Sequence, residues 1–247
     1  MNNSKFFKQT NTYLKKNLYY NKKLDHKILD ELGFFVIKDA FDQKIVEKYR
    51  SKFLKEISKN KLQKTKNHLV EFKIEKFHFF KKIYKELKLK KIVKGFFNGN
   101  VGSDFYRIVK KDKNNTKPVF CHQDVGYQLG SFDRYSLFIS LTKNNNLNGG
   151  LIVYPSTHKF GYLGDVGQIS KNTTKKFTKT CPNLECGDIL VMHSSLWHES
   201  EINYAKSDRI YFEIHIQKST EPSTKFIICG KKRRLQSNFF DKKKIFS

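Results

Sequence analysis

Apolar residues recur at helical spacing in the first part of the chain. Residues 45–57 carry an apolar side chain at every fourth position, which is typical of an amphipathic helix packed on a core. Asp42 stands just before this stretch, where a short acidic side chain caps a helix N-terminus. The same spacing predicts a short helix over 28–32 and a second helical region over 74–93. A compact apolar strand is expected at 33–37, between the short helix and the helix over 45–57.

From residue 101 onward the pattern changes to short apolar runs separated by turn residues, which indicates β-strands. A long polar stretch at 161–180 interrupts them and has the length and composition of a loop that closes over a site. The strands are expected at 105–109, 119–125, 135–141, 151–154, 189–192, 209–217 and 226–228.

This order of elements predicts the fold class. Helices followed by seven or eight strands favour an α+β, mainly β protein, with a closed or sandwiched β core and helices packed outside. A single barrel or sandwich can use a chain of this length, so we expect one domain over 26–230. We expect residues 1–25 to form a basic polar leader and the basic residues 231–247 to form a solvated tail.

Charge and hydropathy narrow the choice of partners. The formal net charge is +26, but only six of the 49 basic residues are arginine, and lysine is spread from end to end. A nucleic-acid-binding protein would concentrate arginine in one patch, so nucleic acid is disfavoured, whereas an anionic small-molecule substrate would be attracted. No run of about 18 apolar residues and no signal peptide occur, so we expect a cytoplasmic protein without membrane insertion.

The clearest chemistry is the His-x-Asp pattern at His122 and Asp124. Alternate side chains of an extended strand point to the same face, so these two residues could share one metal ion. A third ligand must then come from another strand, and His193 and His198 are both candidates. Two neutral imidazoles and one carboxylate form the facial triad of non-haem Fe(II) oxygenases, which leaves three coordination positions open.

Further motifs follow this pattern in a fixed order. They are His122-Gln123-Asp124 with Tyr127, Asn148 to Lys159, Gly187 to His193, His198-Glu199-Ser200, Asn203, Ser207 and Arg209. Over about 119–217 the set resembles the phytanoyl-CoA dioxygenase family of Fe(II)/2-oxoglutarate oxygenases, and 33–42 resembles the family's N-terminal strand. The resemblance implies a double-stranded β-helix (jelly-roll, cupin-like) core over about 101–230, with the N-terminal helices packed outside.

The resemblance also implies a metal site and a reaction. His122, Asp124 and His198 would hold Fe(II), because the residues around His198, and not those around His193, match the family pattern. Asp124 favours hydroxylation over halogenation, since related halogenases have a small residue in its place. The implied activity is a dioxygenase that uses Fe(II), 2-oxoglutarate and O2 to hydroxylate a small molecule, with release of succinate and CO2.

Four residues are implied in binding 2-oxoglutarate. Arg209 would bind its far carboxylate with a planar fork, and Ser200 would donate a hydroxyl to the same group. Gln123 would contact the co-substrate or orient a ligand, and Phe138 would pack against the co-substrate.

Two other readings of the sequence were weighed against this one. The first is a non-catalytic binding protein on the same fold, associated with nucleic acid. The second is a cupin-type metal enzyme. The combination of His122, Asp124, His198 and Arg209 argues against the binding protein, because an idle site has no reason to keep all four. A cupin-type enzyme usually carries more histidine ligands, and Arg209 would then have no assigned partner.

Overall fold

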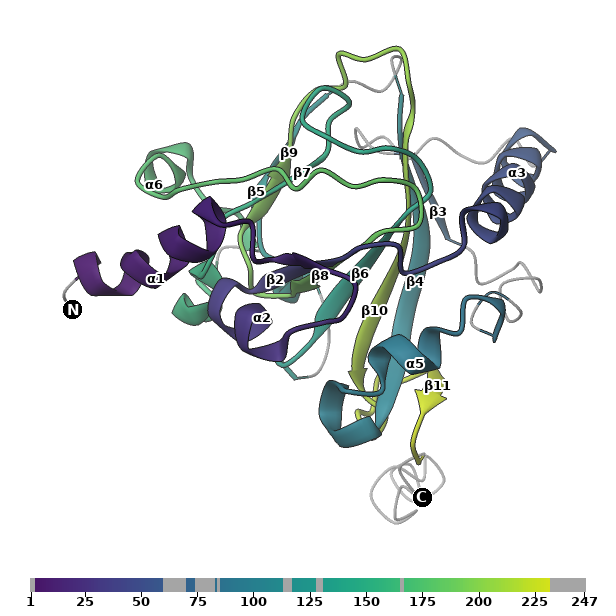
Figure 1. Ribbon diagram of the computed structural model, residues 1–247, viewed down its shortest axis with the longest axis horizontal. Helices are drawn as coiled ribbons and strands as arrows, with labels where there is room; N and C mark the ends of the chain where they lie inside the picture. Colours follow the sequence, from purple (N-terminus) through teal and green to yellow (C-terminus); the bar gives the residue numbers. More distant parts are fainter. Residues whose placement is uncertain are drawn as a thin grey trace, which may run out of the picture.

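Two β-sheets face each other at the centre of the molecule (Figure 1). A computed structural model describes residues 3–59, 70–73, 83, 85–112, 117–127, 131–164 and 167–231. The larger sheet has the strand order β1-β2-β8-β6-β10-β4-β11, with β3 also paired to β4, and the smaller sheet has the order β5-β9-β7. Neighbouring strands are antiparallel except for the parallel pair β1 and β2.

The strands expected from the sequence pattern are present close to their predicted positions, but two of them end differently in a way that matters for the site. The strand expected over 105–109 extends to Lys111. The predicted strand over 119–125 ends early, at His122. The strands are β1 (Tyr20–Asn21), β2 (Phe34–Ile37), β3 (Val70–Lys73), β4 (Val101–Lys111), β5 (Val119–His122), β6 (Tyr135–Ser140), β7 (Leu151–Val153), β8 (Ile189–His193), β9 (His198–Ser200), β10 (Arg209–Lys218) and β11 (Phe226–Cys229).

The helices come mainly from the N-terminal part of the chain. They are α1 (Asn3–Lys15), α2 (His26–Leu32), α3 (Gln43–Lys59), α5 (Leu89–Val93) and α6 (Lys171–Thr174), with 3-10 turns η1 (Phe96–Gly99), η2 (Asp124–Tyr127) and η3 (Thr157–Phe160). The expected N-cap of α3 is confirmed, because Asp42 Oδ1 accepts the backbone N–H of Lys44 at 2.8 Å. Residues 74–82 of the predicted second helical region, and nearly all of the predicted tail, lie outside the described residues.

Strand β10 shows how the larger sheet divides apolar and polar side chains. Ile210, Phe212, Ile214 and Ile216 join the cluster that packs under the helices, whereas Tyr211 joins the cluster between the sheets. Because side chains alternate along a strand, the odd-numbered positions of β10 face the smaller sheet. These inward positions are Arg209, Tyr211, Glu213, His215 and Gln217.

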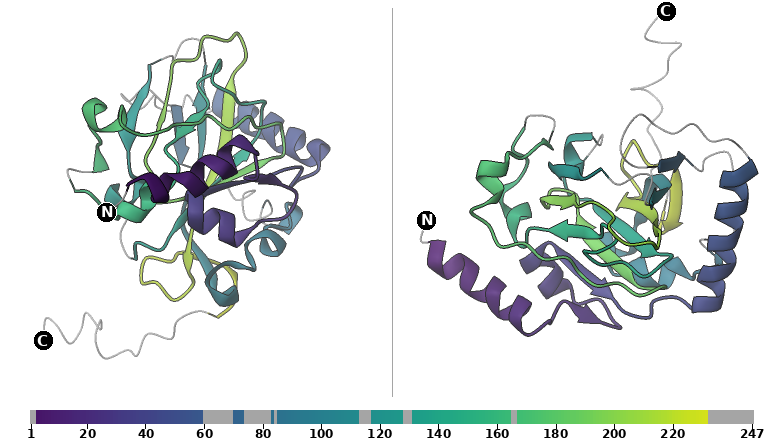
Figure 2. Two further views of the ribbon diagram at one scale, coloured as in Figure 1. Left: turned by 60° about the vertical axis from the view of Figure 1, so that its left-hand side comes forward. Right: turned by 90° about the horizontal axis from the view of Figure 1, so that it is seen from above.

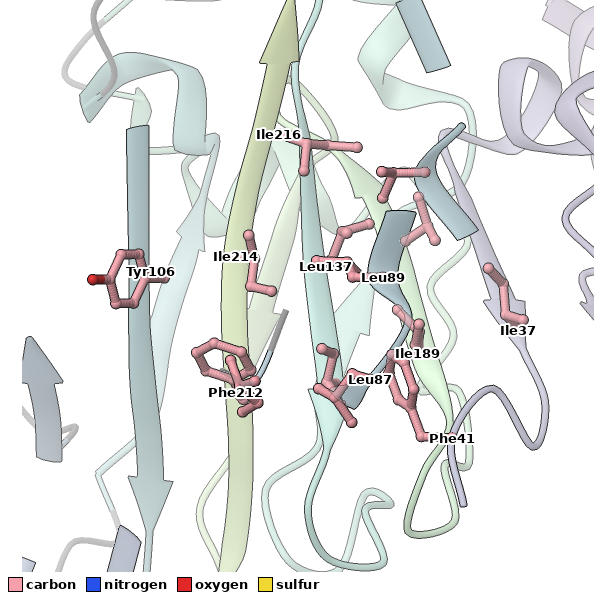
Figure 3. Close-up of a cluster of buried hydrophobic side chains, with 14 of the residues drawn as sticks. Ile37, Phe41, Leu87, Leu89, Tyr106, Leu137, Ile189, Phe212, Ile214 and Ile216 are labelled. Carbon is pink, nitrogen blue, oxygen red and sulfur yellow. The ribbon is translucent and has the colours of Figure 1, made fainter. Parts of the chain in front are cut away.

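The helices cover the outer face of the larger sheet. Figure 3 shows side chains of β6, β8 and β10 gathered on one side of the sheet, together with Leu87 and Leu89. Helix α3 adds Tyr49 and Phe53 to this cluster, and the Phe53 ring lies 6.0 Å from that of Phe212. The expectation of N-terminal helices packed outside a β core is therefore confirmed. In Figures 1 and 2, α3 and α1 lie on opposite sides of the molecule.

Residues 3–21 contribute more structure than their polar composition indicates. β1 extends the larger sheet by pairing with β2, and Tyr19 is buried between the sheets. The Thr10 hydroxyl of α1 forms a buried hydrogen bond of 2.8 Å with the Ser156 hydroxyl. Within the described residues, no helix has both the length and the apolar character needed to cross a membrane.

Replacing Phe212 by alanine is expected to lower the free energy of unfolding by about 3–5 kcal/mol, because the change leaves a cavity between α3 and the sheet. Leu147→Ala is a suitable control, since Leu147 is exposed and its loss should change stability by less than about 0.5 kcal/mol. Urea denaturation of both variants measures the difference. Equal stabilities would mean that α3 is not packed on β10 as described.

Candidate metal centre and co-substrate site

Two histidines are brought face to face by the smaller sheet. In the antiparallel pair of β5 and β9, His122 lies opposite His198, and their ring centroids are 4.2 Å apart. His198 is almost fully buried, and His122 is partly exposed at the edge of the sheet. The strand pairing itself therefore brings two of the three expected metal ligands together.

Asp124 joins these histidines by a turn, which corrects the prediction that His122 and Asp124 lie on one extended strand. β5 ends at His122 and Asp124 begins the turn η2. The backbone N–H groups on either side of Asp124 leave the strand ladder, since Gln123 donates to Gly167 O at 2.8 Å and Val125 donates to Ser194 O at 3.0 Å. Both acceptors come from distant parts of the chain, so the local pattern could not predict the turn.

The ligand atoms of the three side chains point to one place. Asp124 Oδ1 lies 3.6 Å from His122 Nε2 and 3.5 Å from His198 Nε2. One ligand atom from each residue falls within 4.8 Å of the others, which is a spacing that a single metal ion can bridge. The structure therefore places His122, Asp124 and His198 together, as the sequence predicts.

Hydrogen bonds orient each of these side chains. His122 Nδ1 lies 2.9 Å from Phe120 O, and His198 Nδ1 lies 3.0 Å from Leu196 O. A backbone carbonyl accepts only from a protonated ring nitrogen, so Nδ1 carries the proton and Nε2 keeps its lone pair for a metal. The Ser136 hydroxyl donates to Asp124 Oδ2 at 3.0 Å, which leaves Oδ1 on the side of the histidines.

The charges of this cluster support one another. Burial opposes the ionised form of Asp124, but the adjacent His198 and His122 rings outweigh burial and hold the pKa of Asp124 well below its usual range. Burial likewise opposes protonation of His198, and the Asp124 carboxylate outweighs it and raises the pKa of His198. The site thus provides a carboxylate at neutral pH beside two imidazole rings, and this carboxylate favours a cation bound between the three side chains.

His193, the rival candidate for third ligand, lies elsewhere. It ends β8 directly opposite Tyr135, and the two rings are 5.2 Å apart. Leu190 and Met192, the even-numbered positions of β8, pack between the sheets. Because side chains alternate along a strand, His193 points to the opposite, outer face. The geometry therefore favours His198.

Two buried cations lie side by side at one end of the inner face. Arg209 of β10 pairs with Lys111 of β4, and both side chains are almost fully buried. The Lys111 ammonium donates to the Ser200 hydroxyl at 3.0 Å and also to Glu201 O. Burial, and then the charge of Arg209, lower the pKa of Lys111 to about 7. Ser200, two residues after His198, connects this cation pair to the metal cluster.

No carboxylate of the described residues forms a direct ion pair with these two cations. Arg209 donates to Gly149 O at 2.6 Å and its guanidinium carbon lies 4.9 Å from the Tyr211 ring centroid. Its Nε is buried without a hydrogen-bond partner. Among the described residues, no carboxylate lies within ion-pair distance of Arg209 or Lys111. A buried cation pair of this kind is stabilised by an anionic ligand.

The other two residues implied in co-substrate binding differ from each other. Phe138 is buried on the inner face of β6, and its ring lies 5.6 Å from that of Tyr211, which stacks under Arg209. This position adjoins the cation pair, and contact with 2-oxoglutarate stays a prediction.

Gln123 is engaged in hydrogen bonds within the protein, and its expected role, to contact the co-substrate or orient a ligand, stays a prediction. Its amide nitrogen donates to Gly161 O and Ser195 O, both at 2.7 Å, and its oxygen accepts the N–H of Leu163 at 3.0 Å. These bonds occupy the polar atoms of the fully buried side chain. Through Gly161 and Leu163, Gln123 fixes the start of the 161–180 loop to the metal-binding turn.

Gln123→Leu should release this loop, because the change removes three hydrogen bonds and leaves the buried Ser195 carbonyl without its partner. We expect faster amide hydrogen exchange at Leu163 and a loss of about 1–3 kcal/mol in the free energy of unfolding. Gln9→Leu on the exposed face of α1 is the control. Unchanged exchange at Leu163 would contradict the anchoring role.

Comparison with known protein families identifies the chain. The family model of phytanoyl-CoA dioxygenase matches residues 29–211, which is well over half of the 247 residues. The chain belongs to the phytanoyl-CoA dioxygenase family. Among curated protein sequences, none matches this chain.

Solved structures of low sequence identity share the fold of this family member. The epimerase SnoN in complex with Fe3+, α-ketoglutarate and nogalamycin RO has a TM-score of 0.71 at 11% identity, covering 79% of this chain and 82% of SnoN. The carbocyclase SnoK from nogalamycin biosynthesis has a TM-score of 0.68 at 14% identity, covering 86% and 87%. EctD from S. alaskensis with 2-oxoglutarate and 5-hydroxyectoine has a TM-score of 0.66 at 14% identity, covering 78% and 74%. The expected double-stranded β-helix fold is thereby confirmed.

Sequence reasoning missed Lys111 of the cation pair. Lys111 was hidden by the abundance of lysine, and its neighbour Lys110 forms ion pairs with Asp112 at 3.2 Å and Asp208 at 3.0 Å. Only the strand register, which pairs Lys111 with Arg209, distinguishes the two lysines.

A second charged group beside Asp124 was also missed. Glu213 Oε2 lies 2.6 Å from Arg107 Nε, and Glu213 Oε1 lies 2.7 Å from His215 Nε2. Asp124, Glu213 and His215 are close enough to hold a metal ion together. Both oxygens of Glu213 are already engaged by Arg107 and His215, so the group is better described as a hydrogen-bonded wall of the site.

Proposed function

We propose that this chain is an Fe(II)- and 2-oxoglutarate-dependent dioxygenase that hydroxylates a small molecule and releases succinate and CO2. The observation that carries the proposal is the convergence of two imidazole nitrogens and one carboxylate oxygen next to a buried cation pair without a described counter-anion. The two imidazoles and the carboxylate would bind the metal ion. The cation pair would bind the far carboxylate of a dicarboxylate that reaches this ion.

The donor set fits Fe(II). His122 and His198 each offer an Nε2 atom with a free lone pair, and Asp124 offers Oδ1. These three atoms lie close enough together to bind one ion. Two histidines and one carboxylate leave three positions of an octahedral ion open, which suffices for a chelating co-substrate and dioxygen. The carbonyl groups of Phe120 and Leu196 and the hydroxyl of Ser136 hold these ligands in place.

The cation pair fits the far carboxylate of 2-oxoglutarate. Arg209 supplies a planar fork that cannot lose its charge, and Lys111 supplies a second donor that already bonds to Ser200. Since His198 and Ser200 share one face of β9, a ligand held by Ser200 extends toward the metal cluster. Phe138 and Tyr211 are buried beside the cation pair and would give the ligand an apolar neighbour that limits the entry of water.

Bound iron and 2-oxoglutarate would supply the oxidising chemistry, in which one oxygen atom of O2 enters succinate and the other enters the product. The chain's own residues hold the ligands, neutralise the co-substrate and shape the cavity. SnoN and SnoK are described as an epimerase and a carbocyclase, so the fold supports other outcomes of this chemistry. Hydroxylation is proposed because Asp124 completes the metal set and the family's founding activity is a hydroxylation.

Turnover of 2-oxoglutarate in air tests the proposal without a known substrate. The purified protein with Fe(II) and 2-oxoglutarate should form succinate slowly, and Asp124→Asn, which keeps the shape but removes the charge, should form none. Folded protein that yields no succinate would overturn the proposal. Once a product is found, oxygen from 18O2 should appear in it, and a product without the label would exclude hydroxylation.

A further inference from the structure

We propose that the mouth of this site binds its substrate through a planar ring system that carries no positive charge. Four exposed aromatic side chains around the metal cluster, which we call the aromatic rim, would stack on that ring: Phe120, Tyr127, Phe132 and Tyr162. The inference rests on the proposed function, since it names the substrate class of the same site.

The first half of the rim surrounds His122. The ring centroid of Phe120 lies 5.5 Å from that of His122, and that of Tyr127 lies 6.1 Å from it, both edge to face. Phe120 and Tyr127 are 52% and 55% exposed, so each is free to contact a ligand that enters above the metal position. Because His122 is the exposed member of the metal cluster, these rings mark the open side of the site.

The second half of the rim is tied to the same turn by hydrogen bonds. Phe132 and Tyr162 stack on each other at 6.3 Å with an interplanar angle of 29°, and are 59% and 40% exposed. Gln123 binds the backbone of Gly161 and Leu163, on either side of Tyr162. Arg134, two residues after Phe132, accepts the backbone N–H of Ser194 at 3.0 Å. The carbonyl of Ser194 in turn accepts the backbone N–H of Val125 at 3.0 Å. Phe132 and Tyr162 are thus held beside the residues that flank Asp124.

Exposed aromatic side chains are concentrated here and sparse elsewhere. Of the six large aromatic side chains that are exposed among the described residues, four form the rim. Single exposed apolar residues need no explanation, but several around one site mark a binding surface. Aromatic rings gain most from partners that are themselves flat, because offset stacking adds to the burial of apolar area.

The wall beside Asp124 also contains planar side chains. The Phe105 ring lies 4.7 Å from that of His215 at 37°, and the Arg107 guanidinium lies 5.3 Å from the Phe105 centroid. Flat groups are therefore also present in the wall beside Asp124. Glu213, the carboxylate of this wall, already forms an ion pair with Arg107 and a hydrogen bond with His215, and offers little to a cation.

The charge of the chain decides which flat molecules are favoured. Aromatic rims also bind cations, but a protein with a formal net charge of +26 repels them and attracts neutral or anionic ligands. A planar ring that is neutral or bears a carboxylate can stack on the aromatic rim and is not repelled by the positive charge of the protein.

Fluorescence titration with 2-naphthoate tests the inference in the presence of Fe(II) and 2-oxoglutarate without oxygen. The saturated analogue decahydro-2-naphthoate and the cation 2-naphthylmethylammonium serve as comparison ligands, the former by competition. We expect naphthoate to bind most tightly, and Phe132→Ala and Tyr162→Ala each to weaken its binding roughly two- to tenfold. Tyr204→Ala, at an exposed tyrosine outside the rim, should leave it unchanged.

Equal binding of the saturated analogue, preference for the ammonium, or rim variants that bind naphthoate like the wild type would each overturn the inference. The outcome is separate from that of the proposed function, because naphthoate fluorescence reports ring binding whether or not the protein holds iron. Absence of the iron–2-oxoglutarate absorption band contradicts the proposed function, and absence of ring-selective binding contradicts the rim.

Discussion

His198→Ala is expected to lose high-affinity binding of Fe(II) and with it all turnover of 2-oxoglutarate. Its Nε2 lies 3.5 Å from Asp124 Oδ1 and supplies one of three donors, so removal leaves a two-ligand site. Loss of a residue that only supports a ligand weakens metal binding by roughly 10–100-fold, and loss of a ligand should exceed this. Equilibrium dialysis with Fe(II) under anaerobic conditions measures the change.

His193→Ala is the matched control for this prediction. It lies five residues earlier, beside Tyr135 on the outer face of the larger sheet, and should bind Fe(II) like the wild type. If His193→Ala lost the metal while His198→Ala kept it, the assignment of the third ligand would be wrong.

Lys111→Met is expected to weaken 2-oxoglutarate binding by roughly 10–100-fold while leaving Fe(II) affinity unchanged. The ammonium bonds to Ser200 beside Arg209, and a charged hydrogen bond to a ligand contributes about 1.5–3 kcal/mol. Methionine keeps the length and burial of the side chain. Lys110→Met is the control, since Lys110 is engaged with Asp112 and Asp208, and it should not change the affinity.

The pH dependence gives Lys111 a second signature. Its pKa is lowered from 10.5 to about 7 in the folded chain, by burial and then by Arg209, so the unfolded chain binds more protons between these values. The free energy of unfolding should therefore rise with pH across this window, and the rise should be smaller in Lys111→Met. Binding of 2-oxoglutarate should also take up a proton above about pH 7, which calorimetry in buffers of different ionisation enthalpy detects.

These two results would separate a co-substrate role from a structural one. Equal 2-oxoglutarate affinity in Lys111→Met and the wild type would show that the buried ammonium does not contact the ligand. Proton uptake that persists in the variant would assign the titrating group to another residue.

Part of the site could be predicted because it depends on residue identity and order. His122, Asp124, His198 and Arg209 stand in a family-like sequence of motifs, and the structure brings the three metal-ligand candidates together. The strands predicted from apolar runs, such as β6 and β8, are present because their side chains are buried on both faces.

The same burial explains what could not be predicted. Since both faces of β8 are apolar, the pattern does not say which face is inward, and His193 could not be excluded from the sequence alone. The turn at Asp124 depends on the carbonyls of Gly167 and Ser194, which lie far along the chain. Lys111 is one lysine among many until the register places it opposite Arg209.

The central claim is tested most directly by adding Fe(II) and 2-oxoglutarate to the apoprotein without oxygen and recording the visible spectrum. The account predicts the charge-transfer band of the iron–2-oxoglutarate chelate, absent in His122→Ala and Arg209→Ala and retained in His193→Ala. A folded wild-type protein without this band, or a band that His122→Ala leaves unchanged, would contradict it.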